Sequence, residues 1–525
     1  MDTKALRQKI LDLAIRGKLV PQDPNDEPAE VLLERIREQK QQMFKEGKLK
    51  KKDIKNDTII FKGEDNLHYE KFQDGTVKCI EDEIPFEVPE GWAWCKLNDI
   101  YNFIDYRGAT PTKITNGIPL VTAKNVKSGY IDYTIDDYIS EEEFKERQQR
   151  GISKKGDILF TTEAPLGNAA LADMEKFSAG QRLITFQQYG SKDELINYVM
   201  LMFILSDFFQ QQLYVNKTGS TVAGIKAAIL KTLWIPVPPY NEQLRISNTL
   251  KSAINLIDSI SKNKEILSTS ISNTKSKILD LAIRGKIVPQ DPNDEPASVL
   301  LERIRAEKEE LIKQGKIKRD KKESVIFKGD DNSYYLRTVG VEESLEDWRF
   351  DDLPETWKIC CLWELCDYGD CINVNTEDIA EDAWILDLED IEKDTGTVLK
   401  KVTKAQRNSV STKHKFHSGQ VLYSKLRPYL NKVVLSDADG YCTSEILPLE
   451  FKNCVLPEYA RYYLMSGTFI AYANHCSYGV KMPRLGTTDG KKAIFSLPPL
   501  SEQKRIVETI DFCFMQLNKI SEALA

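Results

Sequence analysis

The sequence lacks the short motifs by which cofactor-binding enzymes are usually recognised. No two glycines are separated by a single residue, so neither a dinucleotide fingerprint nor a glycine loop for S-adenosylmethionine is visible, and no GxxxxGK[ST] loop is present. Of only four histidines, none forms an HExxH pair; His414 and His417 lie in a basic run without carboxylates, a setting that favours a phosphate or solvent contact over a metal. Three neighbouring cysteines, Cys361, Cys366 and Cys371, also lack CxxC spacing. We therefore expect no metal site and no catalytic residues in this chain.

Long apolar runs are missing as well. The longest, Tyr198 to Leu205, is far shorter than the ~20 residues of a membrane span. The charged start MDTKALRQK has no apolar core behind it, so no secretory signal is visible. Ten scattered cysteines fit reduced thiols better than a disulfide framework. With 525 residues, these features predict a cytoplasmic protein of three or four compact units.

The charge is unevenly distributed. A net charge of −7 argues mildly against nucleic acid, because DNA-binding domains are usually basic. However, Lys400 to Ser436 contains nine Lys or Arg and no acid, whereas Glu377 to Asp394 contains nine acids and one lysine. Phe208 to Asn241 has three lysines and again no acid. The stretches without acids are compatible with a nucleic-acid surface or with an ordinary solvated face.

The chain contains two copies of one unit. Lys9 to Lys40 recurs as Lys277 to Lys308 with 28 of 32 positions identical, and the similarity continues more loosely to FKG(E/D)DN segments. In a second repeat, PPYNEQLRI at Pro238 recurs as PPLSEQKRI at Pro498. The intervening stretches, about 84–239 and 350–499, share only a few anchors, among them Pro165 with Pro428 and Asn168 with Asn431. Two domains that diverge within a fixed frame indicate two different targets of one kind.

Each EQ motif predicts the start of a long helix, with Asn241 or Ser501 available as the cap and Gly285 at the first helix's end. Apolar residues then recur at alternating spacings of four and three, as in a coiled coil. The seam positions we select are Ile246, Leu250, Ile257, Ile260, Ile506, Ile510, Leu517 and Ile520. The predicted C-terminal helix has no counterpart to the last turns of the central helix, and the N-terminal segment around Ile10 matches those turns. This match indicates a circular arrangement in which the two ends of the chain together form the second long helix.

These features predict an α+β protein in which two mixed α/β recognition domains are joined by long antiparallel coiled-coil helices with pseudo-two-fold symmetry. The expected parts are a frame at 1–83, a first recognition domain at 84–240, a central region with the spacer helix and repeated frame at 241–349, a second recognition domain at 350–500, and a C-terminal coiled-coil helix at 501–525.

The sequence resembles the specificity subunit of type I restriction–modification enzymes. The resemblance rests on the paired PP-x-(N/S)EQ-x-RI helix starts, on GDILF and its counterpart GQVLY, and on TGSTVAGI at Thr218 with its counterpart GVKMPR at Gly479. Their order and duplication cover nearly the whole chain. The duplicated LDLAIRGK(L/I)VPQDPNDEP frame of about 75 residues is a departure from the minimal family pattern.

The resemblance implies two target-recognition domains, each reading one half of a split double-stranded DNA site. It also implies that two methyltransferase subunits and two motor-nuclease subunits dock on the chain, and that these partners bind the S-adenosylmethionine, ATP and Mg²⁺. This chain itself would bind no cofactor. We expect DNA contacts from cationic, amide and hydroxyl side chains, at Arg107, Lys124, Asn125, Lys217, Ser220, Thr221, Lys413, Lys415, Lys425, Arg427, Tyr429, Lys481 and Arg484. Lys425 and Arg427 alternate on an expected strand and would share one face.

Two alternative functions compete with this one. A coiled-coil interaction scaffold with two protein-binding domains and no DNA role would suit the net acidic charge. A single-chain restriction–methylation enzyme would need the missing cofactor motifs. Val237 to Tyr240 (VPPY) is similar to the Pro-Pro-aromatic motif of amino-methylating enzymes, but valine stands where Asn or Asp must accept the target amine.

Overall fold

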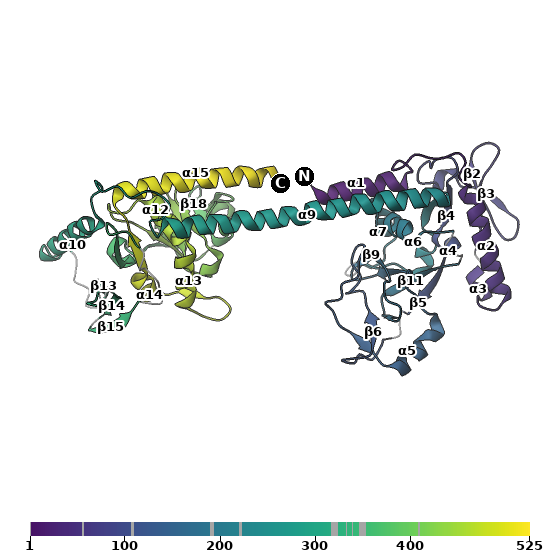
Figure 1. The fold of residues 1–525 in the computed structure, drawn as a ribbon, viewed down its shortest axis with the longest axis horizontal. Coiled ribbons are helices and arrows are strands. Elements are labelled where there is room, and N and C mark those ends of the chain that lie inside the picture. Colours follow the sequence, from purple (N-terminus) through teal and green to yellow (C-terminus); the bar gives the residue numbers. More distant parts are fainter. Residues whose placement is uncertain are drawn as a thin grey trace. The chain divides into compact units, whose positions relative to one another are not determined.

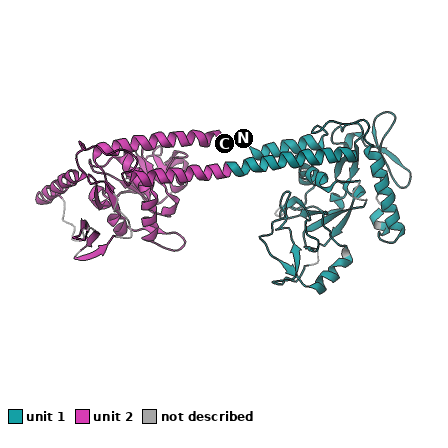
Figure 2. Ribbon diagram, in the orientation of Figure 1, with its two compact units in different colours: residues 1–263 teal, residues 264–525 magenta. Residues whose placement is uncertain are grey.

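The protein is described from a computed structural model that covers residues 2–54, 57–106, 110–189, 194–219, 223–316, 324–331, 333–338, 340–345, 353–407 and 410–524 (Figure 1). It divides into two compact units, residues 1–263 and 264–525 (Figure 2), which are described separately. The predicted α+β fold, with two mixed α/β parts and a long central helix, is confirmed. The finer domain boundaries chosen from the sequence stay predictions.

The first unit begins with a frame of helices and a small antiparallel sheet in the order β1-β2-β3. Its elements are α1 (Thr3–Ile15), α2 (Ala29–Lys45), α3 (Lys51–Ile54), β1 (Ile59–Lys62), β2 (His68–Lys71) and β3 (Val77–Cys79). Asp2 caps α1 by accepting from the backbone of Lys4 and Ala5. Gly17 follows α1 with φ +63°, and a side chain there would collide with Pro89, so glycine is required.

The recognition part of the first unit is built around a four-stranded antiparallel sheet in the order β5-β11-β8-β9. Those strands are β5 (Tyr101–Asp105), β8 (Ile158–Thr162), β9 (Leu166–Leu171) and β11 (Leu183–Gln188). A second sheet holds β6 (Ile118–Val121), β7 (Tyr138–Ile139) and β10 (Ser178–Ala179), and β4 (Ala93–Lys96) pairs with β12 (Trp234–Val237). The helices are α4 (Leu97–Ile100), α5 (Glu141–Arg147), α6 (Asn197–Ile204), α7 (Asp207–Val215) and α8 (Ala227–Leu230). The all-apolar run found in the sequence forms most of α6 and is buried in the main core.

The second unit repeats this plan with a divergent recognition part. Its frame contains α10 (Ala297–Lys313), β13 (Ser324–Lys328), β14 (Tyr334–Thr338) and β15 (Val341–Ser344). Its main sheets are ordered β17-β20-β23-β18-β19 and β22-β21-β24. Their strands are β17 (Ile372–Val374), β18 (Trp384–Leu386), β19 (Val402–Thr403), β20 (Lys413–Phe416), β21 (Val421–Ser424), β22 (Val433–Leu435), β23 (Gly440–Thr443) and β24 (Ile446–Leu449).

The remaining elements of the second unit match the order found in the first. The strand β16 (Lys358–Cys361) pairs with β27 (Ile494–Leu497), as β4 pairs with β12. The other elements are α11 (Leu362–Leu365), α12 (Pro457–Leu464), α13 (Gly467–His475), β25 (Ser477–Tyr478), β26 (Arg484–Leu485), α14 (Thr487–Lys492) and α15 (Leu500–Leu524).

The long helix α9 (Tyr240–Ala282) contributes its first part to unit 1 and its second part to unit 2. It ends just before Gly285, which has φ +65°, so the predicted stop is confirmed. Its start differs from the prediction. The helix begins at Tyr240 because the Gln243 N–H already bonds the Pro239 carbonyl, and Asn241 therefore lies in the first turn instead of capping it. Ser501 lies inside the first turn of α15 in the same way.

Each terminal helix packs antiparallel to α9 within its own unit. In unit 1, Arg7 pairs with Asp258 near one end of α1, and Gln22, just beyond its other end, bonds Glu242 at the start of α9. In unit 2, Lys275 of α9 donates to Asn518 of α15 at 2.6 Å. Of the predicted seam, Ile246, Leu250, Ile257, Ile506 and Ile510 are buried, and Ile260 and Leu517 are half-buried. Ile520 is 46% exposed, so its side chain is not part of a buried seam.

The repeated Gln of the EQ motif fastens each long helix to its recognition part. The Gln243 side chain is fully buried, accepts from the Ile196 N–H at 2.8 Å, and donates to the carbonyls of Pro238 and Glu194. Gln503 makes the matching set, accepting from the Leu456 N–H at 2.8 Å. An amide serves here because it supplies both an acceptor and two donors from one side chain.

The repeated Glu of the motif fastens the same helices to the frame. Glu242 is buried and accepts from the Trp92 indole at 2.9 Å and from Gln22 at 3.1 Å. Glu502 accepts from Trp357 and Gln290 in the same geometry. Burial raises the pKa of both carboxyl groups despite these donors.

Candidate nucleic-acid interface

The basic stretch of the second unit is partly neutralised inside the protein. Arg407 is only 11% exposed at its side chain and pairs with Asp387 at 2.6 Å and with the fully buried Asp390. Lys404 pairs with Glu381 at 3.0 Å, and Lys400 lies 3.6 Å from Asp390. Carboxylates of the acid-rich stretch therefore pair with cations of the acid-free stretch. This part of the basic run is thus not a free surface for DNA.

The rest of that stretch divides between core and surface. Lys413 on β20 is 2% exposed, and its ammonium group donates to the Ser411 hydroxyl at 2.7 Å, so the expected DNA contact is at odds with its position in the core. Lys415, two residues further along the same strand, is exposed. Within the described residues no carboxylate pairs with Lys415, Lys425 or Arg427.

Lys425 and Arg427 lie on a loop, which corrects the strand expected from the sequence. The strand β21 ends at Ser424, and Arg427 has the left-handed conformation with φ +50°. Burial still alternates along this loop, because Leu426 is buried and the cations on either side of it are half-buried. We call residues 425–431 the recognition loop of unit 2; its Tyr429 is exposed.

The recognition loop is docked onto the β25–β26 hairpin, residues 477–485. The Arg427 N–H donates to the Pro483 carbonyl at 2.7 Å, and the Leu485 N–H donates to the Lys425 carbonyl at 3.0 Å. At the hairpin tip, Tyr478 is 63% exposed, and Val480, Lys481 and Met482 also face solvent. The structure therefore brings Lys425, Arg427, Tyr429, Lys481 and Arg484 together on two adjacent segments, although they are far apart in the sequence.

Unit 1 has the same arrangement with different residues. Its recognition loop, residues 162–168, runs from the last residue of β8 into the start of β9 and contains the cis Ala164–Pro165 peptide, with Ala164 at φ +46°. The Ile225 N–H donates to the Thr162 carbonyl at 3.0 Å, and Glu163 forms a bridge with Gly224. The segment around Thr218, singled out in the sequence as the counterpart of the hairpin, therefore docks on the loop as the hairpin does.

The residues of unit 1 that were predicted to contact DNA differ in their exposure. Lys124 is exposed, and Lys217 is exposed with its ammonium group 4.9 Å from the centre of the Tyr214 ring. Asn125 is 3% exposed: its oxygen accepts from Thr122, and its nitrogen donates to the carbonyls of Asp132 and Ile135. The amide oxygen and nitrogen of Asn125 are therefore both occupied by groups of its own loop, which argues against a contact with a base. Arg107, Ser220 and Thr221 lie outside the described residues.

Sequence reasoning missed two pairs of charged residues on these surfaces. Arg182, just before β11, pairs with Glu163 at 3.0 Å. Glu445, just before β24, holds Arg484 through several contacts, the shortest at 2.7 Å. The exposed aromatic residues Tyr214 and Tyr478 were also missed. A usable signal was the position of Arg182 and Glu445, each immediately before a strand that pairs with the strand leading into the recognition loop.

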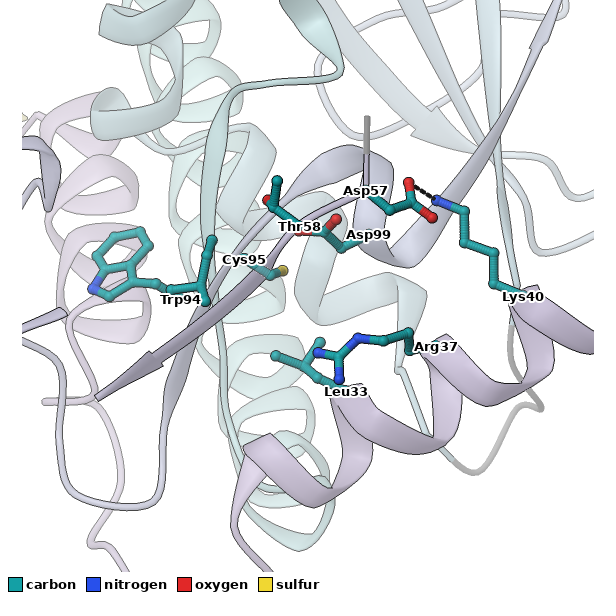
Figure 3. A pocket seen from close by; sticks show the side chains of 9 residues that line it. Leu33, Arg37, Lys40, Asp57, Thr58, Trp94, Cys95 and Asp99 are labelled. Atoms are coloured by element: carbon teal, nitrogen blue, oxygen red, sulfur yellow. Dashed lines mark hydrogen bonds and ion pairs between the residues drawn. The ribbon is translucent and has the colours of Figure 1, made fainter. Parts of the chain in front are cut away.

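A small cavity lies in the frame of unit 1, among α2, β1, β4 and α4 (Figure 3). Its volume is about 30 Å³, enough for one or two water molecules and too little for a nucleotide. Lys40, one of the residues that line it, bonds Asp57 at 2.7 Å (Figure 3) and also bonds the Asn98 carbonyl. Burial raises the pKa of Asp57 and raises that of Asp99 to about 6. This network supports the frame.

Among the described residues, no group of three His, Cys, Asp or Glu side chains could hold a metal ion. His414 is buried with Nδ1 2.8 Å from the Ile446 carbonyl, and His417 pairs with Glu450, so the two rings do not converge. All ten cysteines are free thiols within the described ranges. None of the helices in those ranges is long and apolar enough to cross a membrane.

Comparison with known proteins gives consistent matches over both units. A family model described as the type I restriction modification DNA specificity domain matches residues 89–268 and 354–523. The EcoAI specificity subunit of Escherichia coli is 28% identical, covering 98% of this chain and 90% of that protein. The EcoEI specificity subunit of Escherichia coli is 26% identical, covering 99% and 90%. A solved structure from work on "complex assembly and conformational transition of the type I R-M system" shares the fold with a TM-score of 0.53 at 16% identity, covering 84% of this chain and 94% of that one.

Proposed function

The chain belongs to the family of type I restriction–modification DNA specificity subunits, and from this we propose that each of its two units reads one half of a bipartite DNA site. The chain is the sequence-specific DNA-binding subunit of such a system. The observation that best supports two separate readers is the repeated docking of a recognition loop on a second segment, with different exposed side chains in each unit.

The residues at these segments suit the chemistry of duplex DNA. Lysines such as Lys124, Lys217, Lys415, Lys425 and Lys481 can neutralise phosphates and set the position of the protein on the duplex. The major groove admits a two-stranded β-ribbon, and the β25–β26 hairpin presents aromatic, apolar and cationic side chains at its exposed tip. A protein-binding scaffold without a DNA role is not favoured, because it does not account for the family match.

We further propose that the chain is not itself catalytic. Two methyltransferase subunits and two motor-nuclease subunits would dock on it, and those partners would bind S-adenosylmethionine, ATP and Mg²⁺. The absence of glycine-loop and P-loop motifs from its sequence supports this assignment. Action on chromosomal DNA together with scattered thiols supports a cytoplasmic location.

The proposal is tested by sequencing the methylated bases of a host that carries this chain together with its methyltransferase partner. A split methylated motif is expected, and its absence with both subunits expressed would refute the assignment.

Replacing residues 84–234 by the matching domain of a relative should change one half of the motif only. A replacement that altered both halves would contradict separate readers. The purified chain alone should transfer no labelled methyl group to DNA.

A further inference from the structure

Arg484 is held in a fixed orientation by Glu445. Its Nε lies 3.0 and 3.1 Å from the two carboxylate oxygens, and its Nη2 donates to one of them at 2.7 Å. The guanidinium group has five N–H donors in a planar fork. Glu445 occupies the side edge formed by Nε and Nη2. Among the described residues, the end edge makes one contact, at 3.4 Å from Nη1 to the Met482 carbonyl.

A guanidinium group held in this orientation suits hydrogen bonding to one base, guanine. Guanine presents two acceptors, O6 and N7, in the major groove, and an arginine can donate to both at once through its end edge. A side chain already fixed by a carboxylate loses less conformational freedom when it makes those bonds. The carboxylate also repels phosphate, so its presence on a DNA-facing surface weakens general affinity. A carboxylate at this place is best explained by orientation of the arginine.

The surroundings of Arg484 match such a role. Arg484 lies opposite Tyr478 in the β25–β26 hairpin, whose tip is exposed. The backbone of Lys425 is bonded both to the Glu445 carbonyl and to Leu485, so the recognition loop, the hairpin and the residue before β24 form one docked surface. From this surface Lys425 and Lys481 can contact phosphates while Arg484 contacts a base edge.

Unit 1 contains a pair of the same kind. Arg182 Nε lies 3.0 Å from Glu163, and both side chains are about half exposed. The Thr162 N–H donates to the Arg182 carbonyl, which joins the pair to the recognition loop of unit 1. In unit 1 the arginine precedes the strand, whereas in unit 2 the glutamate does. The glutamate of unit 1 lies in its recognition loop, whereas the arginine of unit 2 lies in the hairpin, so each unit has an arginine–carboxylate pair beside its loop although the positions of the pairs differ.

We propose that Arg484 reads a guanine in one half-site with Glu445 as its positioning residue, and that Arg182 reads a guanine in the other half-site with Glu163 in the same role. This inference rests on the proposed function, because it names the base that each reader recognises. It assigns specificity to two carboxylates that would otherwise only oppose DNA binding.

The test compares methylated motifs from hosts that carry the chain with its methyltransferase partner. In the Arg484→Lys variant the positive charge is kept and the fork is lost, so one G·C position in one half should become degenerate. Arg182→Lys should relax one position in the opposite half. With purified complexes and duplexes that differ at that pair, the preference for guanine should fall about tenfold to a hundredfold in each variant, and the salt dependence of binding should not change.

The glutamates are tested by a separation of discrimination from affinity. Glu445→Ala should lose preference at the position affected by Arg484→Lys, while affinity for non-specific duplex stays equal or rises because a negative charge is removed. Glu445→Gln keeps one acceptor oxygen and should lose less preference than alanine. A purely structural role would instead lower the thermal midpoint and weaken binding to all duplexes alike, and this result would overturn the proposal.

Arg337→Lys is the matched control, since Arg337 makes a similar exposed contact with Glu342, Nε to oxygen at 2.8 Å, on the frame sheet. It should leave the motif unchanged. If the wild-type complex yields no split motif, the proposed function fails and this inference with it. If the wild-type motif is split but stays the same in both arginine variants, the inference alone is refuted.

Discussion

Replacing the buried Gln243 by alanine should destabilise unit 1 while unit 2 keeps its stability. The substitution removes three hydrogen bonds and leaves the Ile196 N–H without its acceptor. A buried donor without a partner costs about 1–3 kcal/mol. With the lost packing of a fully buried side chain we expect a total loss of about 3 kcal/mol, which lowers the thermal midpoint by about 6–12 °C in a unit of this size.

The assay is hydrogen exchange of the full chain, followed peptide by peptide through a urea series. Gln243→Ala should speed exchange in α6 and around β12 and leave α12 and β27 unchanged. Gln503→Ala is the matched variant and should produce the reverse pattern, because its contacts repeat those of Gln243 in unit 2. Gln42, an exposed residue of α2, provides the control substitution and should have no measurable effect.

The reasoning would be refuted by a loss below about 1 kcal/mol in unit 1, since that would mean that water or a neighbouring group replaces the amide at little cost. Equal destabilisation of both units by Gln243→Ala would refute the view that each EQ motif serves its own unit. The two outcomes are distinguishable, because the first concerns the size of the effect and the second its location.

Three further outcomes are expected. Arg407→Ala should destabilise unit 2 by about 3 kcal/mol in urea unfolding, because it removes the shortest ion pair of the buried Asp390 and leaves Lys400 at 3.6 Å as its remaining cation among the described residues; an unchanged midpoint would contradict the pairing. Replacing Lys425 and Arg427 together by alanine should weaken DNA binding and reduce its salt dependence by about two charges; an unaltered slope would exclude phosphate contacts. Burial raises the pKa of Asp99 and of Asp157 to about 6. Because both folded values exceed the unfolded value of about 3.9, unit 1 should gain stability as the pH falls from 7.5 to 5.5; a lower urea midpoint at pH 5.5 would contradict this.

The sequence alone determined the duplicated plan. Near-identity of the two frames, the repeated EQ motif and the alternating apolar spacing gave the α+β class, the long central helix and its end near Gly285. These features are readable because they depend on local chemistry: a left-handed glycine ends a helix, and a periodic apolar face must be buried. The residues of the EQ motif were found as a helix start, but their buried hydrogen bonds could not be seen.

The candidate interface was only partly predictable. The sequence identified Lys425, Arg427 and Arg484, and the structure places them on adjacent segments. It could not show that Lys413 is buried while Lys415 on the same face is exposed, because alternation along a strand does not say how much of a face the neighbouring segments cover. Asn125 was selected for its amide, and the same amide proved able to satisfy its own loop.

Only the tertiary structure decided which charges remain available. Along the sequence, Arg407 and Lys425 belong to one acid-free stretch, yet the first is neutralised by carboxylates some twenty residues earlier and the second faces none among the described residues. Likewise, Arg484 and Glu445 are 39 residues apart and meet only because β24 and the hairpin flank the same loop. Charge counts along a chain record composition, whereas pairing depends on distances of a few ångströms that the fold alone sets.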